Sequence, residues 1–190
     1  MSNSSAIIIP MAEILDIVNE KDEIIGQAPR DEVHEKGLTC RMVYVWFYTP
    51  DKQLILQRRS LTKKNHPGRL TTAVSGHVES GMGYAGSAIK ETLEETGVSI
   101  ASSELVDAGV VHARYEDEAA SRYISDAMRA SFLYRYDGDV ATLKVEDGEG
   151  AGFELWPVDD LLPIEEGDTR FVTFLTSPHA RAILQRIQSL

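Results

Sequence analysis

The sequence contains very little cysteine and no long apolar run. Its 190 residues include one cysteine, Cys40, so no disulfide can form within the chain and a disulfide-stabilised secreted scaffold is excluded. We therefore expect a reducing compartment such as the cytoplasm. No apolar run approaches the roughly 20 residues that a membrane-spanning helix needs. The first residues, MSNSSAIIIPMAE, lack the basic stretch and cleavage site of a signal peptide, so neither export nor a membrane partner is expected.

Basic residues are also scarce relative to acidic ones. The chain carries 19 lysines and arginines against 30 aspartates and glutamates, a formal charge of −11 at pH 7. Such a balance argues against a nucleic acid polymer or an acidic lipid surface as a partner. The apolar share of 43% is enough for a buried core, and the length suits a single domain spanning residues 1–190.

The acidic excess is unevenly distributed along the chain. Residues 101–170 hold 17 acidic and 6 basic side chains, which accounts for the whole net charge. In the balanced remainder, five basic side chains fall within twelve residues that contain no acid, namely Arg58, Arg59, Lys63, Lys64 and Arg69. A solvated loop explains this run as well as a phosphate-binding segment does, although guanidinium and ammonium groups both suit phosphate oxygens.

Periodicity and turn signals predict one domain with many strands and few helices, hence an α/β or α+β fold. A helix is predicted over residues 84–96, where Gly97 stands in the C-terminal capping position. A final helix over 177–190 begins with Ser177 as the N-cap and Pro178 at the first helical position. Strands are expected in a hairpin over 14–25 and then at 42–48, 53–57, 71–75, 105–114, 127–136 and 153–158, with a short helical piece at 159–162.

Three glutamates of the predicted helix fall at positions i, i+3 and i+4. This spacing places Glu91, Glu94 and Glu95 on one face, where like charges destabilise a helix. A solvated acidic face is the commonest explanation of such a triplet taken alone. A cation such as Mg²⁺ would remove the repulsion and could bridge a diphosphate. Gly76, which allows a ligand to approach the backbone closely, and the basic run before it favour the metal site.

Residues 76–98, GHVESGMGYAGSAIKETLEETGV, resemble the Nudix box, the pattern G-x5-E-x7-R-E-U-x-E-E-x-G-U in which U is aliphatic. Gly76 matches the first glycine, and the second half is matched by Glu91, Glu94, Glu95, Gly97 and Val98. The N-terminal half, with DIVNEKDEIIGQAPRDEVHEKG, QLILQRRS and SGH, resembles the branch of MutT-like Nudix proteins near isopentenyl-diphosphate isomerase.

The resemblance implies a fold, a cofactor and a reaction. The fold is an α/β/α sandwich with a mixed central sheet, preceded by a hairpin extension within residues 1–40. The box forms a loop, a helix and a loop, and its glutamates Glu91, Glu94 and Glu95 bind Mg²⁺ or Mn²⁺. The implied reaction is hydrolysis of a diphosphate linked to another moiety, and a homodimer is a family-level expectation.

The box departs from the family pattern at three positions. Met82 stands at the first glutamate, Lys90 at the arginine and Thr92 at an aliphatic position. In the family the first two side chains pair and brace the loop against the helix. Because Met82 carries no charge, this brace is either absent or rebuilt, and Glu79 is a candidate replacement. The metal-binding half is intact, but the departures leave room for weak activity or none.

This chain lacks the reactive side chains that the isomerase reaction needs. Ser75 stands where the isomerases have a catalytic cysteine, and a hydroxyl is a poor substitute for a thiol. Of the histidines that bind the isomerase metal, His77 matches, His34 lies near a match, and the third position is Cys40. No glutamate stands at 125–127, where the isomerase has its catalytic one. We expect His77 to be a loop histidine bonded to the backbone and Cys40 to be a small buried apolar side chain.

The sequence thus predicts a metal-dependent hydrolase acting on a diphosphate linkage in a small molecule, such as a nucleoside diphosphate derivative. An alternative from another class is a binding or regulatory protein on the same fold. Two candidates remain for the general base, Glu94 and an acidic residue of the segment 146–149. If that segment has no role in the reaction, it is a plain solvated turn. The residues expected at the site are the cation ligands Glu91, Glu94 and Glu95, the phosphate-binding Arg58, Arg59, Lys63 or Lys64, and the box residues Gly76, His77 and Lys90.

Four aromatic side chains complete the expectations. Trp46 and Trp156 lie inside apolar strands and are expected in the core. Tyr115 and Tyr123 flank an acidic segment and are candidates for lining a base pocket, although no other residue singles them out.

Overall fold

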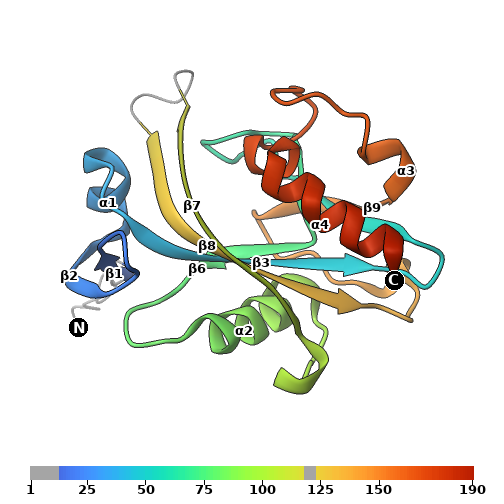
Figure 1. Ribbon diagram of the computed structural model, residues 1–190, viewed down its shortest axis with the longest axis horizontal. Helices are drawn as coiled ribbons and strands as arrows, with labels where there is room; N and C mark the ends of the chain where they lie inside the picture. Colours follow the sequence, from blue (N-terminus) through green and yellow to red (C-terminus); the bar gives the residue numbers. More distant parts are fainter. Residues whose placement is uncertain (1–12, 118–122) are drawn as a thin grey trace, which may run out of the picture.

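The chain folds around a seven-stranded sheet, shown in the computed structural model of Figure 1, which describes residues 13–117 and 123–190. The strand order is β5-β4-β3-β8-β7, with β6 paired to β3 and β9 paired to β4. Strands β3 and β8 run parallel and the other pairs antiparallel, so the predicted mixed sheet is confirmed. The strands are β3 (Cys40–Tyr48), β4 (Gln53–Arg59), β5 (Leu70–Thr72), β6 (Val74–His77), β7 (Val106–Asp117), β8 (Tyr123–Arg135) and β9 (Gly150–Pro157).

Helices cover both faces of this sheet, which gives the predicted α/β/α arrangement. Alternate residues of a strand face opposite sides, and β3 follows this rule with Val43, Val45 and Phe47 on one face and Tyr44 and Trp46 on the other. Helix α2 (Tyr84–Thr96) packs on the first face, whereas α3 (Val158–Leu161), η3 (Thr173–Thr176) and α4 (Pro178–Ser189) cover the second (Figure 1). Two further short turns are η1 (Ser102–Glu104) and η2 (Val140–Thr142).

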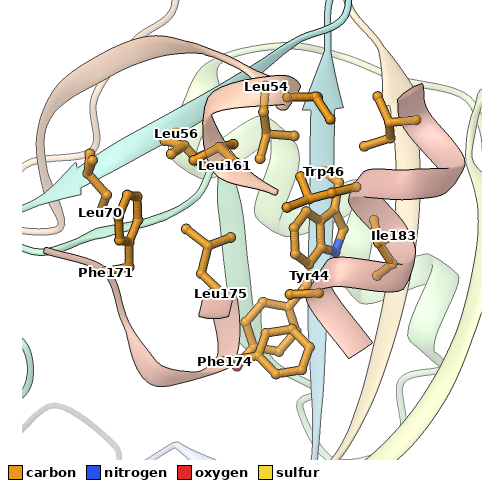
Figure 2. Close-up of a cluster of buried hydrophobic side chains, with 14 of the residues drawn as sticks. Tyr44, Trp46, Leu54, Leu56, Leu70, Leu161, Phe171, Phe174, Leu175 and Ile183 are labelled. Atoms are coloured by element: carbon orange, nitrogen blue, oxygen red, sulfur yellow. The ribbon is translucent and has the colours of Figure 1, made fainter. Parts of the chain in front are cut away.

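The core under α4 is built from aromatic and aliphatic side chains of the sheet and the C-terminal segment. Trp46 is fully buried against Ile183, as predicted, and the rings of Tyr44 and Phe174 have centroids 4.2 Å apart (Figure 2). Trp156 is only half-buried and stands edge-on to Phe171 at 5.5 Å. This packing holds the segment before α4, which contains Phe174, over one end of the sheet.

The N-terminal hairpin forms as predicted and supports the loop between β6 and α2. Strands β1 (Ile14–Val18) and β2 (Ile24–Pro29) pair around the polar turn, and Leu15 packs in a small core with Cys40. Asp16 accepts hydrogen bonds from the hydroxyl of Ser80 (2.7 Å) and the amide of Gly81 (3.1 Å). These bonds hold the pKa of Asp16 below its usual value despite burial, so the extension holds the box loop with a charged carboxylate.

Three expectations from the sequence need correction. A helix, α1 (Arg30–Lys36), follows the hairpin, although its seven residues show no apolar repeat long enough to predict it. The strand expected at 71–75 is two strands, because β5 pairs with β4 while β6 crosses to pair with β3. Strand β7 extends to Asp117 rather than ending at residue 114.

The two predicted helix ends are confirmed. Gly97 closes α2 in the left-handed conformation (φ 72°), with its amide bonded to the carbonyl of Leu93. Ser177 caps α4 by accepting from the amide of Ala180, with Pro178 at the first position. Among the described helices, none is long and apolar enough to cross a bilayer.

Removing the cap of α4 is expected to lower stability. The Ser177→Ala substitution leaves the amide of Ala180 without its side-chain partner, so the free energy of unfolding should fall by about 1 kcal/mol in urea titrations. Ser189→Ala, in the exposed last turn of the same helix, is the matched control and should change it by less than about 0.5 kcal/mol. Equal effects of the two substitutions would contradict the capping role.

Candidate active site

A cavity of about 790 Å³ opens where α2, β6, the segment before β5 and the segment before α4 meet. Its walls carry opposite charges, with glutamates from α2 and basic side chains from the end of β4 and the loop that follows. Among the predicted site residues, those that line the cavity are Arg59, Lys63, Lys64, Gly76, His77, Lys90, Glu91, Glu94 and Glu95. The fold therefore brings the basic run and the box together, as the order of charges in the sequence predicted.

Glu95 is the most deeply placed carboxylate of the site. Its side chain is 5% exposed, and it accepts hydrogen bonds from the Ser75 amide and from Nε2 of Gln57, each 3.2 Å long. Burial raises the pKa of Glu95 well above its ordinary value, the negative charge of Glu91 adds to the shift, and the two hydrogen bonds oppose it. A carboxylate in this position is costly to ionise unless a positive charge accompanies it.

Glu91 lies against the backbone of Gly76, one turn before Glu95 on α2. A Cβ atom added to Gly76 would stand 2.4 Å from the carboxyl carbon of Glu91, so only glycine leaves room for this side chain. Burial raises the pKa of Glu91 to about 7, an effect that Lys90 opposes and Glu94 reinforces. The match of Gly76 to the first residue of the box therefore has a steric reason: it makes space for the carboxylate of Glu91.

Lys90 rebuilds the brace that Met82 cannot provide. Its ammonium group lies 3.2 Å from Glu79, 2.8 Å from Glu94 and 3.9 Å from Glu91. The pKa of Lys90 is raised, chiefly by the hydrogen bond to Glu94. Met82 instead packs against the core under α2. The contact between Lys90 and Glu79 agrees with the expectation that Glu79 replaces the missing acid at position 82. Glu94 is ion-paired with Lys90, so the acidic face of α2 includes a compensating positive charge.

The donor groups fit a divalent cation, although no ready-made site is assembled. In the stretches 13–117 and 123–190, no three side chains of Asp, Glu, His or Cys converge closely enough to hold a metal ion. Glu91 and Glu95 nevertheless offer carboxylate oxygens, the donors that Mg²⁺ and Mn²⁺ prefer. Burial raises the pKa of both groups, and the charge of Glu91 raises that of Glu95 further. A cation between them would favour the charged form of each. Glu94 would join them once its ion pair with Lys90 opened.

The two adjacent arginines of β4 point to different surroundings. Arg59 lines the cavity and donates from Nε and Nη2 to the carbonyl of Asn65, which ties it to the Lys63–Lys64 loop. Arg58 is not among the cavity-lining residues: its Nε lies 2.6 Å from Glu154 and its Nη1 donates to the carbonyl of Gly68. Successive residues of a strand face opposite sides, so the structure does not place Arg58 at the site that the sequence suggested.

Two acidic residues of the segment 146–149 also reach the cavity. Lys63 forms an ion pair with Glu149, and both side chains line the cavity. Glu146 lies beside them, and its pKa is raised by burial and by the charge of Glu149. The segment therefore contributes two carboxylates to the cavity that holds Glu91 and Glu95, rather than forming a remote solvated turn.

The histidine of the box behaves differently from its predicted role. His77 lies in strand β6 rather than in a loop, and its Nε2 is 2.9 Å from Nε2 of His34 rather than bonded to the backbone. Because Nδ1 of His34 faces the carbonyl of Ile124 at 2.9 Å, it carries the proton, and Nε2 of His34 accepts from His77. Burial lowers the pKa of both rings, so the pair is neutral. Cys40 is fully buried, as predicted, and burial raises the pKa of its thiol to about 12.

Several cavity residues were not identified from the sequence. Arg129, in the middle of β8, is 1% exposed and still borders the cavity, together with Tyr44 and Arg30. Each lies in a segment that reads as ordinary strand or short helix, and only the pairing of β3 with β8 brings Arg129 to the site. Tyr115 and Tyr123, which the sequence offered as pocket residues, do line this cavity.

The profile of the NUDIX domain matches residues 38–175. The chain therefore belongs to the NUDIX family. It is 40% identical over 87 residues to the uncharacterized Nudix hydrolase SCO1686 of Streptomyces coelicolor. This match covers 46% of this chain and 48% of the relative. It is 26% identical over 152 residues to the uncharacterized Nudix hydrolase CA_C0446 of Clostridium acetobutylicum, covering 78% and 72%. The chain spans about half the length of several curated relatives that it matches.

Solved structures of low identity share the fold. DR0079 from Deinococcus radiodurans superposes with a TM-score of 0.64 at 22% identity, covering 92% of this chain and 99% of its own. The NUDIX domain of Shewanella oneidensis NrtR, solved with ADP ribose, has a TM-score of 0.56 at 12% identity, covering 86% and 100%. The α/β class predicted from the sequence is thus the family fold.

Proposed function

We propose that this chain is a divalent-metal-dependent hydrolase of a diphosphate linkage. The observation that carries the proposal is the cavity itself, which is lined by the buried carboxylate of Glu95, the half-buried one of Glu91 and the basic side chains of Arg59 and Lys63. The raised pKa values of both glutamates show that their charged forms need a cation, and a metal-bound diphosphate would supply the cation and phosphate oxygens for the basic side chains. Family membership supports the reaction class, since relatives that match this chain carry the name Nudix hydrolase.

The chain's own residues divide the work of such a reaction. Glu91 and Glu95, joined by Glu94, would hold Mg²⁺ or Mn²⁺, and the bound ion would supply charge neutralisation for phosphate oxygens and activation of water. Arg59 and the lysines of the following loop bind the remaining phosphate oxygens. A carboxylate of the segment 146–149 accepts the proton of the attacking water, for which the raised pKa of Glu146 suits it. Glu94 is the alternative acceptor, but its ion pair with Lys90 makes it the weaker one.

For the substrate we infer a nucleoside diphosphate derivative. Tyr115 and Tyr123 offer aromatic faces in the cavity that carries the phosphate-binding side chains. Two structural neighbours support this class: the NrtR domain was solved with ADP ribose, and a Caenorhabditis elegans protein of TM-score 0.51 is an Ap4A hydrolase. At 12% and 15% identity these neighbours share the fold, so they guide the choice of assay rather than fix the substrate.

The test is turnover of a panel of nucleoside diphosphate derivatives with Mg²⁺ or Mn²⁺, read as release of nucleoside monophosphate or phosphate. We expect turnover that requires the metal and is lost on addition of EDTA. A second candidate is a binding protein without turnover. Two features favour it: the ion pair with Lys90 keeps Glu94 from a metal, and Met82 replaces the negatively charged first glutamate of the box. Tight binding of these ligands without turnover on any of them would establish this alternative.

Filling the space at Gly76 should weaken metal binding without unfolding the protein. In Gly76→Ala the new methyl group meets the end of the flexible Glu91 side chain, so the carboxylate must move. We expect Mn²⁺ affinity, measured by titration calorimetry, to fall at least about 10-fold while the melting temperature changes little. Gly26→Ala, where an added Cβ meets nothing within 4 Å, is the control and should leave the affinity unchanged. An unchanged affinity in Gly76→Ala would show that Glu91 does not bind the metal.

A further inference from the structure

Arg129 carries a buried positive charge that the proposed reaction does not use. It lies in the middle of β8 with 1% of its surface exposed. Among the described residues no carboxylate lies within ion-pair distance of it, and its Nε has no hydrogen-bond partner. Burying a charge without a counter-ion is unfavourable. The site around Arg129 is therefore incomplete as it stands, and it borders the cavity that holds the candidate catalytic groups.

Aromatic rings and two hydroxyl groups surround the guanidinium. Its carbon lies 5.0 Å from the ring of Tyr115, 5.6 Å from Phe174 and 5.9 Å from Tyr44, so three π faces partly offset the charge. Nη1 donates to the hydroxyl of Tyr44 over 2.7 Å and to the sulfur of Met42 over 3.1 Å. Nη2 donates to the hydroxyl and carbonyl of Ser125 over 2.8 and 2.9 Å and to the carbonyl of Ala113 over 3.4 Å. These contacts fix the guanidinium plane and use most of its hydrogens.

The two hydroxyl groups must then donate their own protons elsewhere. A hydroxyl that accepts from a cation directs its O–H away from that cation. For both Tyr44 and Ser125 the nearby acceptor is the sulfur of Met42, at 3.9 and 4.0 Å, a weak contact. Both residues line the cavity. Arg129 thus polarises two hydroxyl donors at the cavity wall, and within residues 13–117 and 123–190 their acceptor is the weak one offered by the Met42 sulfur.

This donor pair shares a cavity with the carboxylates of the proposed reaction. Tyr44 stands on the face of the sheet that η3 and α4 cover, whereas Glu91 and Glu95 belong to α2 on the other face. Ser75, the in-register partner of Tyr44, donates its amide to Glu95, so the two faces meet at this strand. A ligand whose diphosphate lies between the glutamates and Arg59 can extend its other moiety through the cavity toward Tyr44, Ser125 and Arg129.

We propose that Arg129, Tyr44 and Ser125 form a specificity site for the moiety attached to the diphosphate, selecting one that carries a carbonyl or carboxylate oxygen. The inference rests on the proposed function and narrows its substrate class. An unsubstituted alkyl diphosphate leaves both donors and the buried charge unsatisfied, and sites built to bind an acceptor reject analogues that lack it. Arg129 acts here as a positioning residue, since its hydrogens already serve the two hydroxyls.

The test compares two non-hydrolysable probes by titration calorimetry in the presence of Mg²⁺. One probe is the α,β-methylene analogue of UDP, which carries base carbonyls, and the other is a simple alkyl methylenediphosphonate. We expect the wild-type chain to bind the first at least about 10-fold more tightly. Tyr44→Phe and Ser125→Ala should each reduce that ratio about three- to 10-fold while leaving the affinity for the alkyl probe unchanged. Tyr48→Phe, on the same face of β3 but outside the cavity, should leave the ratio as it is.

The possible outcomes separate this inference from the proposed function. Equal affinities for the two probes in the wild type, or an unchanged ratio in both hydroxyl variants, would overturn the specificity site alone. Failure of both probes to bind in a Mg²⁺-dependent way would overturn the diphosphate function and the inference with it. Arg129→Met serves as a second variant, because an apolar side chain of similar length often replaces a buried charge without loss of stability. It should lose the preference for the carbonyl-bearing probe while keeping a cooperative melting transition.

Discussion

Glu95→Gln is expected to lower metal-dependent turnover by about 10³-fold or more. The substitution keeps the size of the side chain, and its one amide oxygen can still accept from the Ser75 amide. Its new NH2 group takes the place of the oxygen that accepted from Nε2 of Gln57, so the Gln57 amide must turn to present its own oxygen as the acceptor. The substitution removes the charge that holds the cation, and a catalytic metal contributes several kcal/mol of transition-state stabilisation. The measurement is kcat/KM for the best substrate of the panel at saturating Mg²⁺. Glu166→Gln, an exposed glutamate outside this cavity, is the control and should retain full activity.

The same substitution should make the metal-free protein more stable, which a merely structural glutamate would not do. Because the pKa of Glu95 is raised in the folded state, that state binds the proton more tightly than the unfolded chain does. The contribution of Glu95 to the stability of the metal-free wild type is therefore fully present below the unfolded pKa of about 4.3, and it is lost as the pH rises through the raised folded pKa. Glu95→Gln lacks this loss.

Thermal melting in EDTA at a series of pH values checks the stability effect. At pH 4 the two proteins should melt at similar temperatures, and at pH 8 the variant should melt higher. Addition of Mg²⁺ should then raise the melting temperature of the wild type more than that of the variant. A variant that is less stable than the wild type at pH 8 in EDTA would mean that Glu95 stabilises the fold through its two hydrogen bonds and is not primarily a metal ligand.

Local patterns were sufficient to predict much of the site. Helix α2 and its cap follow from the apolar repeat and Gly97, and the placement of Glu91, Glu94 and Glu95 on one face follows from their spacing along that helix. The contact between Lys90 and Glu79 could also be anticipated, because the loss of one charge at Met82 leaves a nearby acid as the natural partner. In each case the interacting residues lie within about three helical turns of one another, where sequence spacing determines geometry.

Long-range pairing explains what the sequence did not predict. Arg129 reaches the cavity because β8 pairs in parallel with β3, which sets it beside Met42. The partner of His77 is His34, more than forty residues earlier and on a helix too short to show a repeat. The split between β5 and β6 likewise follows from two different partner strands. None of these contacts leaves a periodic signal, because each depends on which strand lies next to which.

The neighbouring arginines Arg58 and Arg59 provide the sharpest test of the phosphate-binding wall. Arg59→Met should raise KM about 100-fold, since a charge-assisted bond to phosphate contributes roughly 1.5–3 kcal/mol. Arg58→Met removes an ion pair with Glu154 in which the side chains are 42% and 35% exposed, and such pairs contribute little. Its KM should stay within about twofold of the wild type.

The comparison is well matched because the two side chains are identical and adjacent on one strand, differing only in the face they occupy. KM and kcat should be measured at two salt concentrations for both variants. The wild type should lose affinity as salt rises, and Arg59→Met should lose less, because one of the charges that attract the phosphate is already gone. If Arg58→Met raised KM as much as Arg59→Met, the diphosphate would have to bind across the opposite face of β4, beside Glu154 and away from Glu91 and Glu95. Such a result would contradict the arrangement of metal and phosphate proposed for this cavity.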